Sequence, residues 1–341
     1  MNAPTAIPDV RALRACWHPV AFAESIGADP VGLELLDEPL VAWWDGGGVP
    51  HVLSDICIHR GTALSLGRIE DGEIVCPYHA WRYAANGVCT RIPQLADPTR
   101  IPAKARVASF ACQERYGLLW VSLEDARWPL PEVAELEDPA SNLVVAGPYS
   151  WNSDASRQLE NFTDFGHFPW VHPGLLGDPS RPVVPEHTVE TDEHVLRYRI
   201  VRPEAPPSDD FPVFGNEVQV EPERRSNYEL HLPYTIVLRI GWGGERRMVY
   251  FFASQPISSD RCSGYVVMAR NYDHDQPPAV LQRFEDTIFN QDQRVVESQR
   301  PEQVPFDLAD ELHLKFDAVA VAYRRAMRAQ GLARSAAGDG A

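Results

Sequence analysis

Two cysteines and two histidines in the first third of the chain are spaced as metal ligands. They form Cys57-Ile58-His59 and Cys76-Pro77-Tyr78-His79, a C-x-H half and a C-x-x-H half separated by sixteen residues. Each half lies in a predicted turn after a short strand, and the gap accommodates a strand, the turn Glu70-Asp71-Gly72 and a second strand. Two loops of this kind can close on one metal centre from opposite sides.

Two other interpretations compete for these four residues. Taken singly, a cysteine is often a small buried hydrophobic residue, and a histidine is often a satisfied polar group. A Cys₂His₂ set also suits zinc, although zinc sites usually pair cysteine with cysteine in one knuckle and histidine with histidine in the other. Here each half carries one thiol and one imidazole.

The pattern resembles the Rieske [2Fe–2S] motif, in which two thiolates hold one iron and two imidazoles hold the other. The flanking residues agree, with Arg60-Gly61 after the first half and Ala80-Trp81-Arg82-Tyr83 after the second. Most oxygenase versions of the motif have glycine where this chain has Ala80, and alanine predicts an ordinary backbone conformation there. Respiratory Rieske proteins staple the loops with two further cysteines. The corresponding positions are Thr62 and Tyr78, which points to the lower-potential, soluble branch.

A second group of chemically competent residues lies in the segment 160–172, which reads ENFTDFGHFPWVH. Asp164 and His167 share one face of an ideal helix, whereas His167 and His172 are separated by about 140° and would not converge. Two prolines predict that the helix ends or kinks near Phe168, which lets His172 turn back toward His167. Two imidazoles brought together in this way bind a divalent metal. A polar helix end with two incidental histidines is the alternative.

A redox metal bound by two histidines still needs a carboxylate ligand. The helix predicted over 277–299 carries one in its C-terminal half. Asp292 lies within an apolar stripe, where a carboxylate is costly unless it is paired or bound to metal. Two histidines and one carboxylate form the facial triad of non-haem Fe(II) oxygenases, which leaves open positions for O₂ and substrate. The other acids of this helix are assigned to a solvated face: Glu285, Asp286 and Glu297.

Together the two groups resemble the Rieske non-haem iron oxygenases over nearly the whole chain. In that family a D-x-x-H-x-x-x-x-H segment supplies both imidazole ligands of the mononuclear Fe(II), matching His167 and His172, and a late helical aspartate matches Asp292. The family's carboxylate that matches Asp164 bridges a cluster histidine of one subunit, matching His79, to an iron-ligand histidine of the next. The resemblance therefore implies a ring-shaped homotrimer.

The resemblance also implies the reaction. Asn290-Gln291-Asp292 and the residues after it look like the monooxygenase branch that includes vanillate O-demethylase and dicamba monooxygenase. One atom of O₂ would enter an aromatic or related small organic substrate, by O- or N-demethylation or by hydroxylation. The sequence shows no Rossmann fingerprint or flavin site, so electrons from NAD(P)H are expected from a separate reductase, a ferredoxin or both. A ring cis-dihydroxylating dioxygenase and a Rieske electron-transfer protein without catalytic iron stay open.

The predicted organisation is a 1–16 arm, a Rieske domain over 17–130, a catalytic iron domain over 131–330 and a disordered tail over 331–341. Short strands at turn spacing predict an all-β first domain, and strands followed by helices predict an antiparallel sheet with helices in the second, an α+β chain. In the second domain we expect helices at 153–168, 277–299 and 307–330, strands at 187–202, 217–222, 227–241, 247–255 and 263–271, and a mobile loop at 203–213.

Composition narrows the partners. The formal net charge of −17 disfavours nucleic acid and anionic membrane surfaces, and there is no apolar run of membrane-spanning length or secretory signal, so a cytoplasmic protein is expected. Three arginines near the first motif, Arg60, Arg68 and Arg82, could guide an acidic electron donor. Candidate substrate-lining residues, each with a core role as the alternative if aromatic, are Asn161, Phe165, His231, Trp242 and Phe284.

Overall fold

The computed structural model describes residues 6–203, 223–242 and 245–335, which divide into two compact units. One unit spans Arg14–Leu130, and the other joins the segment before Arg14 to the chain from Pro131 onward. The predicted strand at 217–222 and most of the predicted loop at 203–213 lie outside the described residues. In the described part of the chain, no helix combines the length and apolar character needed to cross a bilayer.

The Arg14–Leu130 unit is built from two antiparallel sheets, as its short strands predict. The larger has the order β2-β11-β10-β5-β4-β3 and the smaller the order β6-β7-β8-β9. Positive φ at Asp71 and Gly72 (54° and 79°) makes the tight predicted turn between β6 and β7. The strands are β2 (His18–Phe22), β3 (Val31–Leu35), β4 (Glu38–Trp44), β5 (Pro50–Ser54), β6 (Arg68–Glu70), β7 (Glu73–Val75), β8 (Arg82–Tyr83), β9 (Cys89–Arg91), β10 (Ser109–Arg115) and β11 (Leu118–Ser122), with 3₁₀ turns η1 (Ala23–Ser25) and η2 (Leu64–Leu66).

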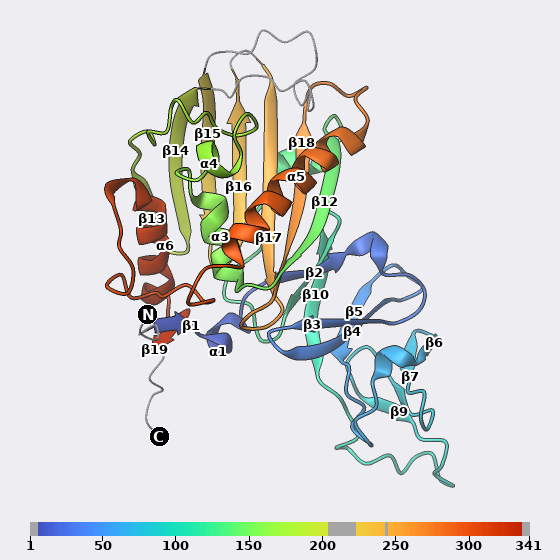
Figure 1. Ribbon diagram of the computed structural model, residues 1–341. Helices are drawn as coiled ribbons and strands as arrows, with labels where there is room; N and C mark the ends of the chain where they lie inside the picture. Colours follow the sequence, from blue (N-terminus) through green and yellow to red (C-terminus); the bar gives the residue numbers. More distant parts are fainter. Residues whose placement is uncertain (1–5, 204–222, 243–244, 336–341) are drawn as a thin grey trace. The chain divides into compact units, whose positions relative to one another are not determined.

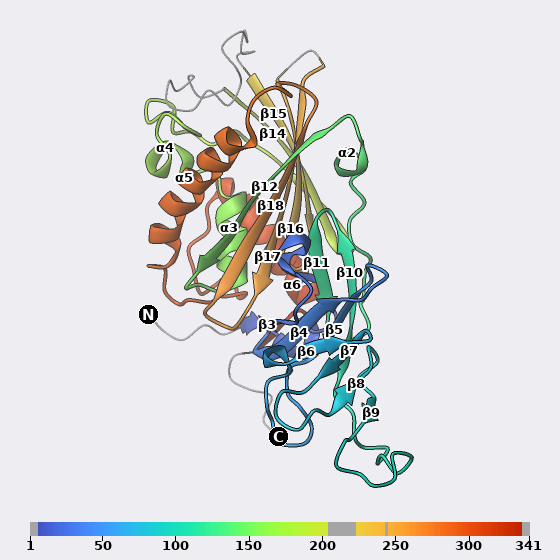
Figure 2. The ribbon, with the colours of Figure 1, turned by 90° about the vertical axis from the view of Figure 1, so that its right-hand side faces the viewer.

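The other unit is organised around a seven-stranded antiparallel sheet with the order β12-β18-β17-β16-β15-β14-β13. Figures 1 and 2 show helices α3 and α5 against one face of this sheet. Phe252 of β17 fixes them there, because its ring stacks on Phe162 of α3 (4.7 Å) and lies 5.9 Å from Phe289 of α5. The strands are β12 (Asn142–Trp151), β13 (Val189–Asp192), β14 (Val195–Pro203), β15 (Glu223–His231), β16 (Thr235–Gly241), β17 (Arg247–Pro256) and β18 (Cys262–Arg270).

The helices of this unit are α1 (Val10–Leu13), α2 (Ala134–Glu137), α3 (Ala155–Thr163), α4 (Phe168–Val171), α5 (Pro278–Val296) and α6 (Ala318–Ala329), with the 3₁₀ turn η3 (Lys315–Asp317). Asp154 caps α3, since its carboxylate accepts from the Ser156 amide at 2.8 Å. The last helix begins later than predicted. The Asp317 carboxylate accepts from the Leu314 amide at 2.7 Å and so caps the start of η3, the 3₁₀ turn directly before α6.

Two strand predictions were wrong, and one strand was missed. The predicted strands 187–202 and 227–241 are each two strands of a hairpin, separated by short turns. Strand β12 was not predicted, because Gly147-Pro148 interrupts its pattern and produces a register shift.

The predicted disordered tail is ordered at its start, where β19 (Ala333–Ser335) pairs with β1 (Ala6–Pro8). The fully buried Leu332 and its carbonyl, which accepts from the Asp9 amide at 2.8 Å, anchor this segment.

Candidate metal centres

The two halves of the first motif form two loops with the same backbone geometry. Four residues after each cysteine, an amide donates to the cysteine carbonyl: Gly61 to Cys57 at 2.8 Å, and Ala80 to Cys76 at 3.0 Å. Gly61 and Ala80 both adopt positive φ, 70° and 56°. The expectation of an ordinary conformation at Ala80 is therefore wrong. Closing the second loop in the same way as the first requires the left-handed conformation, at a cost of about 1 kcal/mol for alanine.

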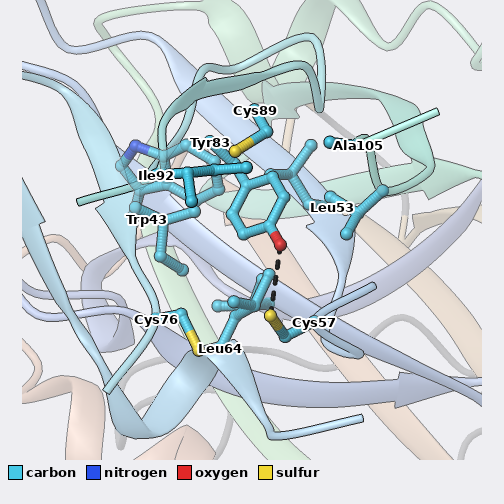
Figure 3. Packing of buried hydrophobic residues seen from close by; sticks show 12 residues of the cluster. Trp43, Leu53, Cys57, Leu64, Cys76, Tyr83, Cys89, Ile92 and Ala105 are labelled. Atoms are coloured by element: carbon cyan, nitrogen blue, oxygen red, sulfur yellow. Dashed lines mark hydrogen bonds between the residues drawn. The ribbon is translucent and has the colours of Figure 1, made fainter. Parts of the chain in front are cut away.

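Both motif sulfurs lie at the edge of a buried apolar cluster. Figure 3 shows the Tyr83 hydroxyl directed at the Cys57 sulfur, 3.1 Å away. Burial, and then the neighbouring Cys57, raise the pKa of the Cys76 thiol, while the amides of Tyr78 and His79 act in the opposite direction. A bound metal cation deprotonates a coordinating thiol and removes the charge that burial disfavours. The pair of buried thiols therefore suits an iron–sulfur centre, and neither Cys57 nor Cys76 forms a disulfide.

The two motif imidazoles lie together. The rings of His59 and His79 are 4.6 Å apart, and His59 stacks on Trp81 at 4.5 Å. The His59 Nδ1 atom is buried and has no hydrogen-bond partner among the described residues, as expected of an atom kept for a metal. Gln94, which the sequence did not single out, accepts from the Trp81 indole at 3.2 Å and donates to the His79 carbonyl at 2.9 Å.

The second centre is formed at a break between α3 and α4. Helix α3 ends at Thr163, earlier than the predicted end near Phe168. The reason is local: the Asp164 carboxylate accepts from the Gly166 amide at 2.8 Å, and this turn competes with the helix. His167 then caps the N-terminus of the one-turn helix α4, and His172 caps its C-terminus. The break brings the two histidines together, 5.2 Å between ring centroids.

Asp292 of α5 completes the group. Its Oδ1 atom lies 2.9 Å from His172 Nε2 and 3.4 Å from His167 Nε2, and the three ligand atoms all lie within 4.8 Å of one another. Ligands at neighbouring positions of an octahedral ion with bonds of about 2.1 Å are about 3 Å apart. The spacing therefore fits one divalent ion held by two imidazoles and one carboxylate.

The outer nitrogens of the two histidines fix their tautomers. His167 Nδ1 lies 3.1 Å from Asp164 Oδ2, and His172 Nδ1 lies 2.7 Å from Gln291 Oε1. Each acceptor holds a proton on Nδ1, so each Nε2 presents a lone pair toward Asp292. Neither Nε2 atom has a hydrogen-bond partner of suitable geometry in the part of the chain that the structure describes. Gln291 was missed from the sequence, where it is only a neighbour of Asp292.

The predicted lining residues lie in different surroundings. Asn161 reaches the centre, with Nδ2 3.4 Å from Asp292 Oδ1, and Phe165 packs edge-to-face on Tyr228 nearby. His231, whose pKa burial lowers to about 4, lies beside His194 and Glu229 instead. Trp242 packs on Tyr272 and Arg224, and Phe284 is half-buried on α5.

The acids of α5 do not share one solvated face. Glu285 is buried, because it lies seven residues before Asp292 and so faces the same side of the helix. Asp286 is exposed and accepts from the Tyr149 hydroxyl at 2.9 Å. Glu297 accepts from the Asn152 amide at 2.8 Å.

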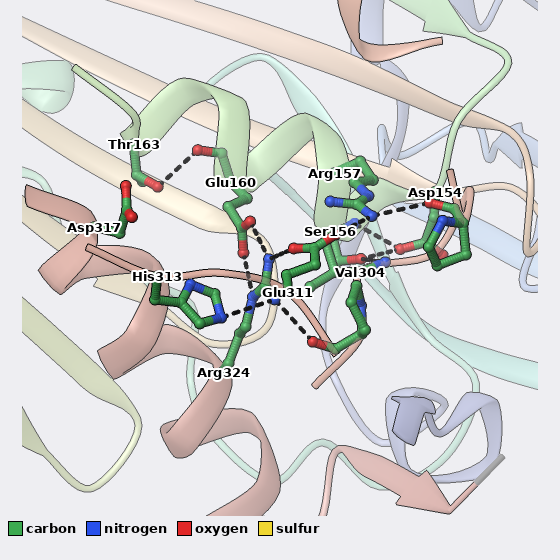
Figure 4. A network of polar contacts seen from close by, with 12 residues as sticks. Asp154, Ser156, Arg157, Glu160, Thr163, Val304, Glu311, His313, Asp317 and Arg324 are labelled. Atoms are coloured by element: carbon green, nitrogen blue, oxygen red, sulfur yellow. Dashed lines mark hydrogen bonds and ion pairs between the residues drawn. The ribbon is translucent and has the colours of Figure 1, made fainter. Parts of the chain in front are cut away.

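A buried ion-pair network holds α3 against the C-terminal part of the chain (Figure 4). Arg324 of α6, only 1% exposed, donates to Glu160 at 2.9 Å and to Glu311 at 2.6 Å. Arg157 of α3 donates to the same Glu311 at 2.8 Å. The network fixes the helix that carries Asn161 and ends just before Asp164. No local sequence signal predicts it.

Comparisons with known proteins match two domain families to this chain. The Rieske [2Fe-2S] domain model matches residues 16–111, and the model of the vanillate O-demethylase oxygenase C-terminal domain matches residues 151–333. Methylxanthine N1-demethylase NdmA of Pseudomonas putida is 33% identical over 330 residues, covering 93% of this chain and 88% of the relative. Methylxanthine N3-demethylase NdmB of the same organism is 30% identical, covering 94% and 90%.

Solved structures give the same result. The structure of Pseudomonas putida NdmA with caffeine has a TM-score of 0.81 and 30% identity, covering 97% of this chain and 98% of that chain. Dicamba monooxygenase bound to dicamba, at 23% identity, shares the fold with a TM-score of 0.80 over 95% of this chain and 98% of that chain. The chain therefore belongs to the Rieske oxygenases with a vanillate O-demethylase type catalytic domain, carries a [2Fe–2S] cluster, and has the role of a Rieske monooxygenase or demethylase.

Proposed function

We propose that the chain is the oxygenase component of a multicomponent N-demethylase, with Fe(II) at the centre formed by His167, His172 and Asp292. The convergence of two unpartnered Nε2 atoms on the Asp292 carboxylate carries this assignment. When bound, the iron and the cluster together supply the activation of O₂ and the insertion of one oxygen atom into substrate. Cys57, His59, Cys76 and His79 are the proposed ligands of the cluster.

Asp164 is proposed to connect the two centres between subunits. Its side chain is 44% exposed while one oxygen holds the Nδ1 proton of His167, so its other face is open to a partner. Exposed apolar side chains occur in the same parts of the chain as both ends of this connection. Phe316 lies next to the Gly166 turn beside Asp164, and Ile56, Ile58 and Tyr78 are within three residues of a proposed cluster ligand. Two different patches on one chain favour head-to-tail association, which closes into a ring such as the proposed homotrimer.

Electrons are proposed to come from NAD(P)H through a separate reductase or ferredoxin, in the cytoplasm. Of the three arginines near the cluster ligands, Arg68 and Arg82 both pair with Glu70, while Arg60 is exposed. Arg60 is therefore the cation best placed to attract an acidic donor. A reduction rate that falls with added salt and with Arg60→Gln supports this docking, and a rate that rises with salt contradicts it.

The relatives' names favour nitrogen-bound methyl groups, since two of them are methylxanthine N-demethylases. Oxidation of an N-methyl carbon gives a hemiaminal that collapses to formaldehyde and the demethylated nitrogen. The test incubates the iron-loaded protein with O₂, a surrogate reductase and panels of N-methyl and methoxy compounds, and then measures formaldehyde. Formaldehyde from N-methyl compounds supports the proposal. A hydroxylated or dihydroxylated product without formaldehyde would contradict demethylation and identify the protein as a hydroxylase or a dioxygenase.

A further inference from the structure

Glu285 is a buried carboxyl group that the metal centre does not use. Its side chain on α5 is 3% exposed, and the Tyr250 hydroxyl of β17 hydrogen bonds with the carboxyl group. The Oε1 atom is buried and has no hydrogen-bond partner among the described residues. Burial raises the pKa of Glu285 to about 8, although Tyr250 and Arg224 act in the opposite direction. A buried acceptor without a hydrogen-bond donor destabilises the protein, which suggests that a bound ligand supplies the donor.

Glu285 faces the same layer as the iron ligands. Seven residues are close to two helical turns, so Glu285 and Asp292 lie on one side of α5 with a rise of about 10 Å between them. Helix α3 spans the same interval: Asn161 lies 3.4 Å from Asp292 Oδ1, and the ring of its neighbour Phe162 lies 6.1 Å from Tyr250. A molecule of one or two fused rings can span this distance, with its methyl group at the metal and its far edge at Glu285.

We propose that Glu285 is a substrate-binding residue whose Oε1 atom accepts a hydrogen bond from an N–H group of the substrate. This inference rests on the proposed function, because it assigns the substrate class of the same site: N-methyl compounds that carry a second, N–H-bearing nitrogen. The ring of Tyr250, whose hydroxyl hydrogen bonds with the carboxyl group, and the ring of Phe162, 6.1 Å from it, suit a flat heterocycle or a cationic amine. Both kinds of molecule offer the same N–H donor, and the variants below distinguish them.

The first experiment compares Glu285→Leu with the neighbouring control Asp286→Asn. Glu285→Leu should lower kcat/KM for N–H substrates roughly 10- to 100-fold, mainly through KM, with metal content unchanged. Its thermal stability should fall slightly, because the buried Tyr250 hydroxyl loses its partner. Asp286→Asn should leave KM unchanged. A purely structural Glu285 would instead give an equal loss of kcat/KM for substrates with and without an N–H group, which overturns the inference.

Glu285→Gln separates the two kinds of donor. Glutamine keeps an acceptor oxygen but cannot become an anion. A neutral heterocyclic N–H should therefore bind this variant nearly as well as the wild type. A cationic amine should lose as much affinity as it does in Glu285→Leu. Full retention of both kinds of substrate in Glu285→Leu contradicts the inference.

Matched substrate pairs complete the test. Theobromine carries a ring N–H where caffeine carries an N-methyl group, and N-methylbenzylamine can be paired with benzyl methyl ether. Wild type should favour the N–H member of at least one pair, and Glu285→Leu should abolish that preference. If wild type demethylates only compounds without an N–H, such as methoxybenzoates, the inference about Glu285 fails, although the protein is still a demethylase. If wild type releases formaldehyde from no compound, the proposed function itself fails.

Discussion

The Oε1 atom of Gln291 lies 2.7 Å from Nδ1 of His172, so the residue before one proposed iron ligand orients another. His172 is fully buried and its ring has no exposed face to rotate toward. The proton on Nδ1 is held by the amide oxygen, which leaves the Nε2 lone pair directed at the metal position. This hydrogen bond thus links His172 to the segment of α5 that carries Asp292, the ligand 120 residues further along the sequence.

Gln291→Leu should therefore weaken iron binding. Loss of the partner of a ligating histidine typically lowers metal affinity or activity roughly 10- to 100-fold. Gln293→Leu is the matched control, because Gln293 donates to Ser150 and Glu297, away from the histidines. The check is a titration of apo-protein with Fe(II), followed by activity. Equal iron affinity in both variants would sink the assigned role of Gln291.

Asp164→Asn should keep both metal centres but abolish coupled turnover. Asparagine can still accept from Gly166, yet it lacks the charge that holds the Nδ1 proton of His167 and, in the proposed bridge, a histidine of the partner subunit. Metal content and the spectrum of the reduced cluster should match wild type, while oxidation of the cluster in a single turnover with substrate and O₂ should stop. Asp178→Asn, which changes an exposed carboxylate, is the control. Normal turnover by Asp164→Asn contradicts the bridging role.

Ala80→Gly should stabilise the cluster-binding unit by about 1 kcal/mol, since glycine adopts φ of 56° without the steric penalty of alanine. The measurement is the thermal midpoint for loss of the cluster's visible absorption in the full chain. Ala85→Gly, at a nearby position without positive φ, should instead lower that midpoint slightly. A lower midpoint for Ala80→Gly would show that strain at this residue does not limit stability.

Arg324→Met should destabilise the catalytic unit by about 3 kcal/mol, because Glu160 loses its buried cation and Glu311 keeps only Arg157. Arg328→Met, one turn later on α6, removes a half-exposed arginine 3.7 Å from Asp307 and should cost less than about 1 kcal/mol. Chemical unfolding of both variants, monitored by tryptophan fluorescence, compares them. Similar losses would mean that the network adds no more than a surface ion pair.

The sequence predicts those parts of the sites that depend on local spacing. The two loops around Cys57 and Cys76 and the order of His167 and His172 are short-range patterns, and the resemblance that they carry leads to Asp292. The family comparisons confirm the architecture that these patterns predict.

The remaining features depend on side-chain contacts that no spacing encodes. The Asp164 turn ends α3 early, since its carboxylate captures the Gly166 amide, and helix propensity alone does not show this. Glu285 is buried because α5 packs with that face on the sheet, although its neighbours in sequence are polar. The hydrogen bonds of Gln94 with His79 and of Gln291 with His172 form only when distant strands, loops and helices pack together.

The most direct test of the two-centre account is quantitative iron and sulfide analysis of the purified protein beside His172→Ala. A [2Fe–2S] cluster and one mononuclear site predict about three irons and two sulfides per chain, with EPR of the reduced protein showing the Rieske signal. His172→Ala should fall to about two irons with that signal unchanged. Two irons per chain in the wild type after Fe(II) loading, equal to the variant, would contradict a catalytic iron at His167, His172 and Asp292.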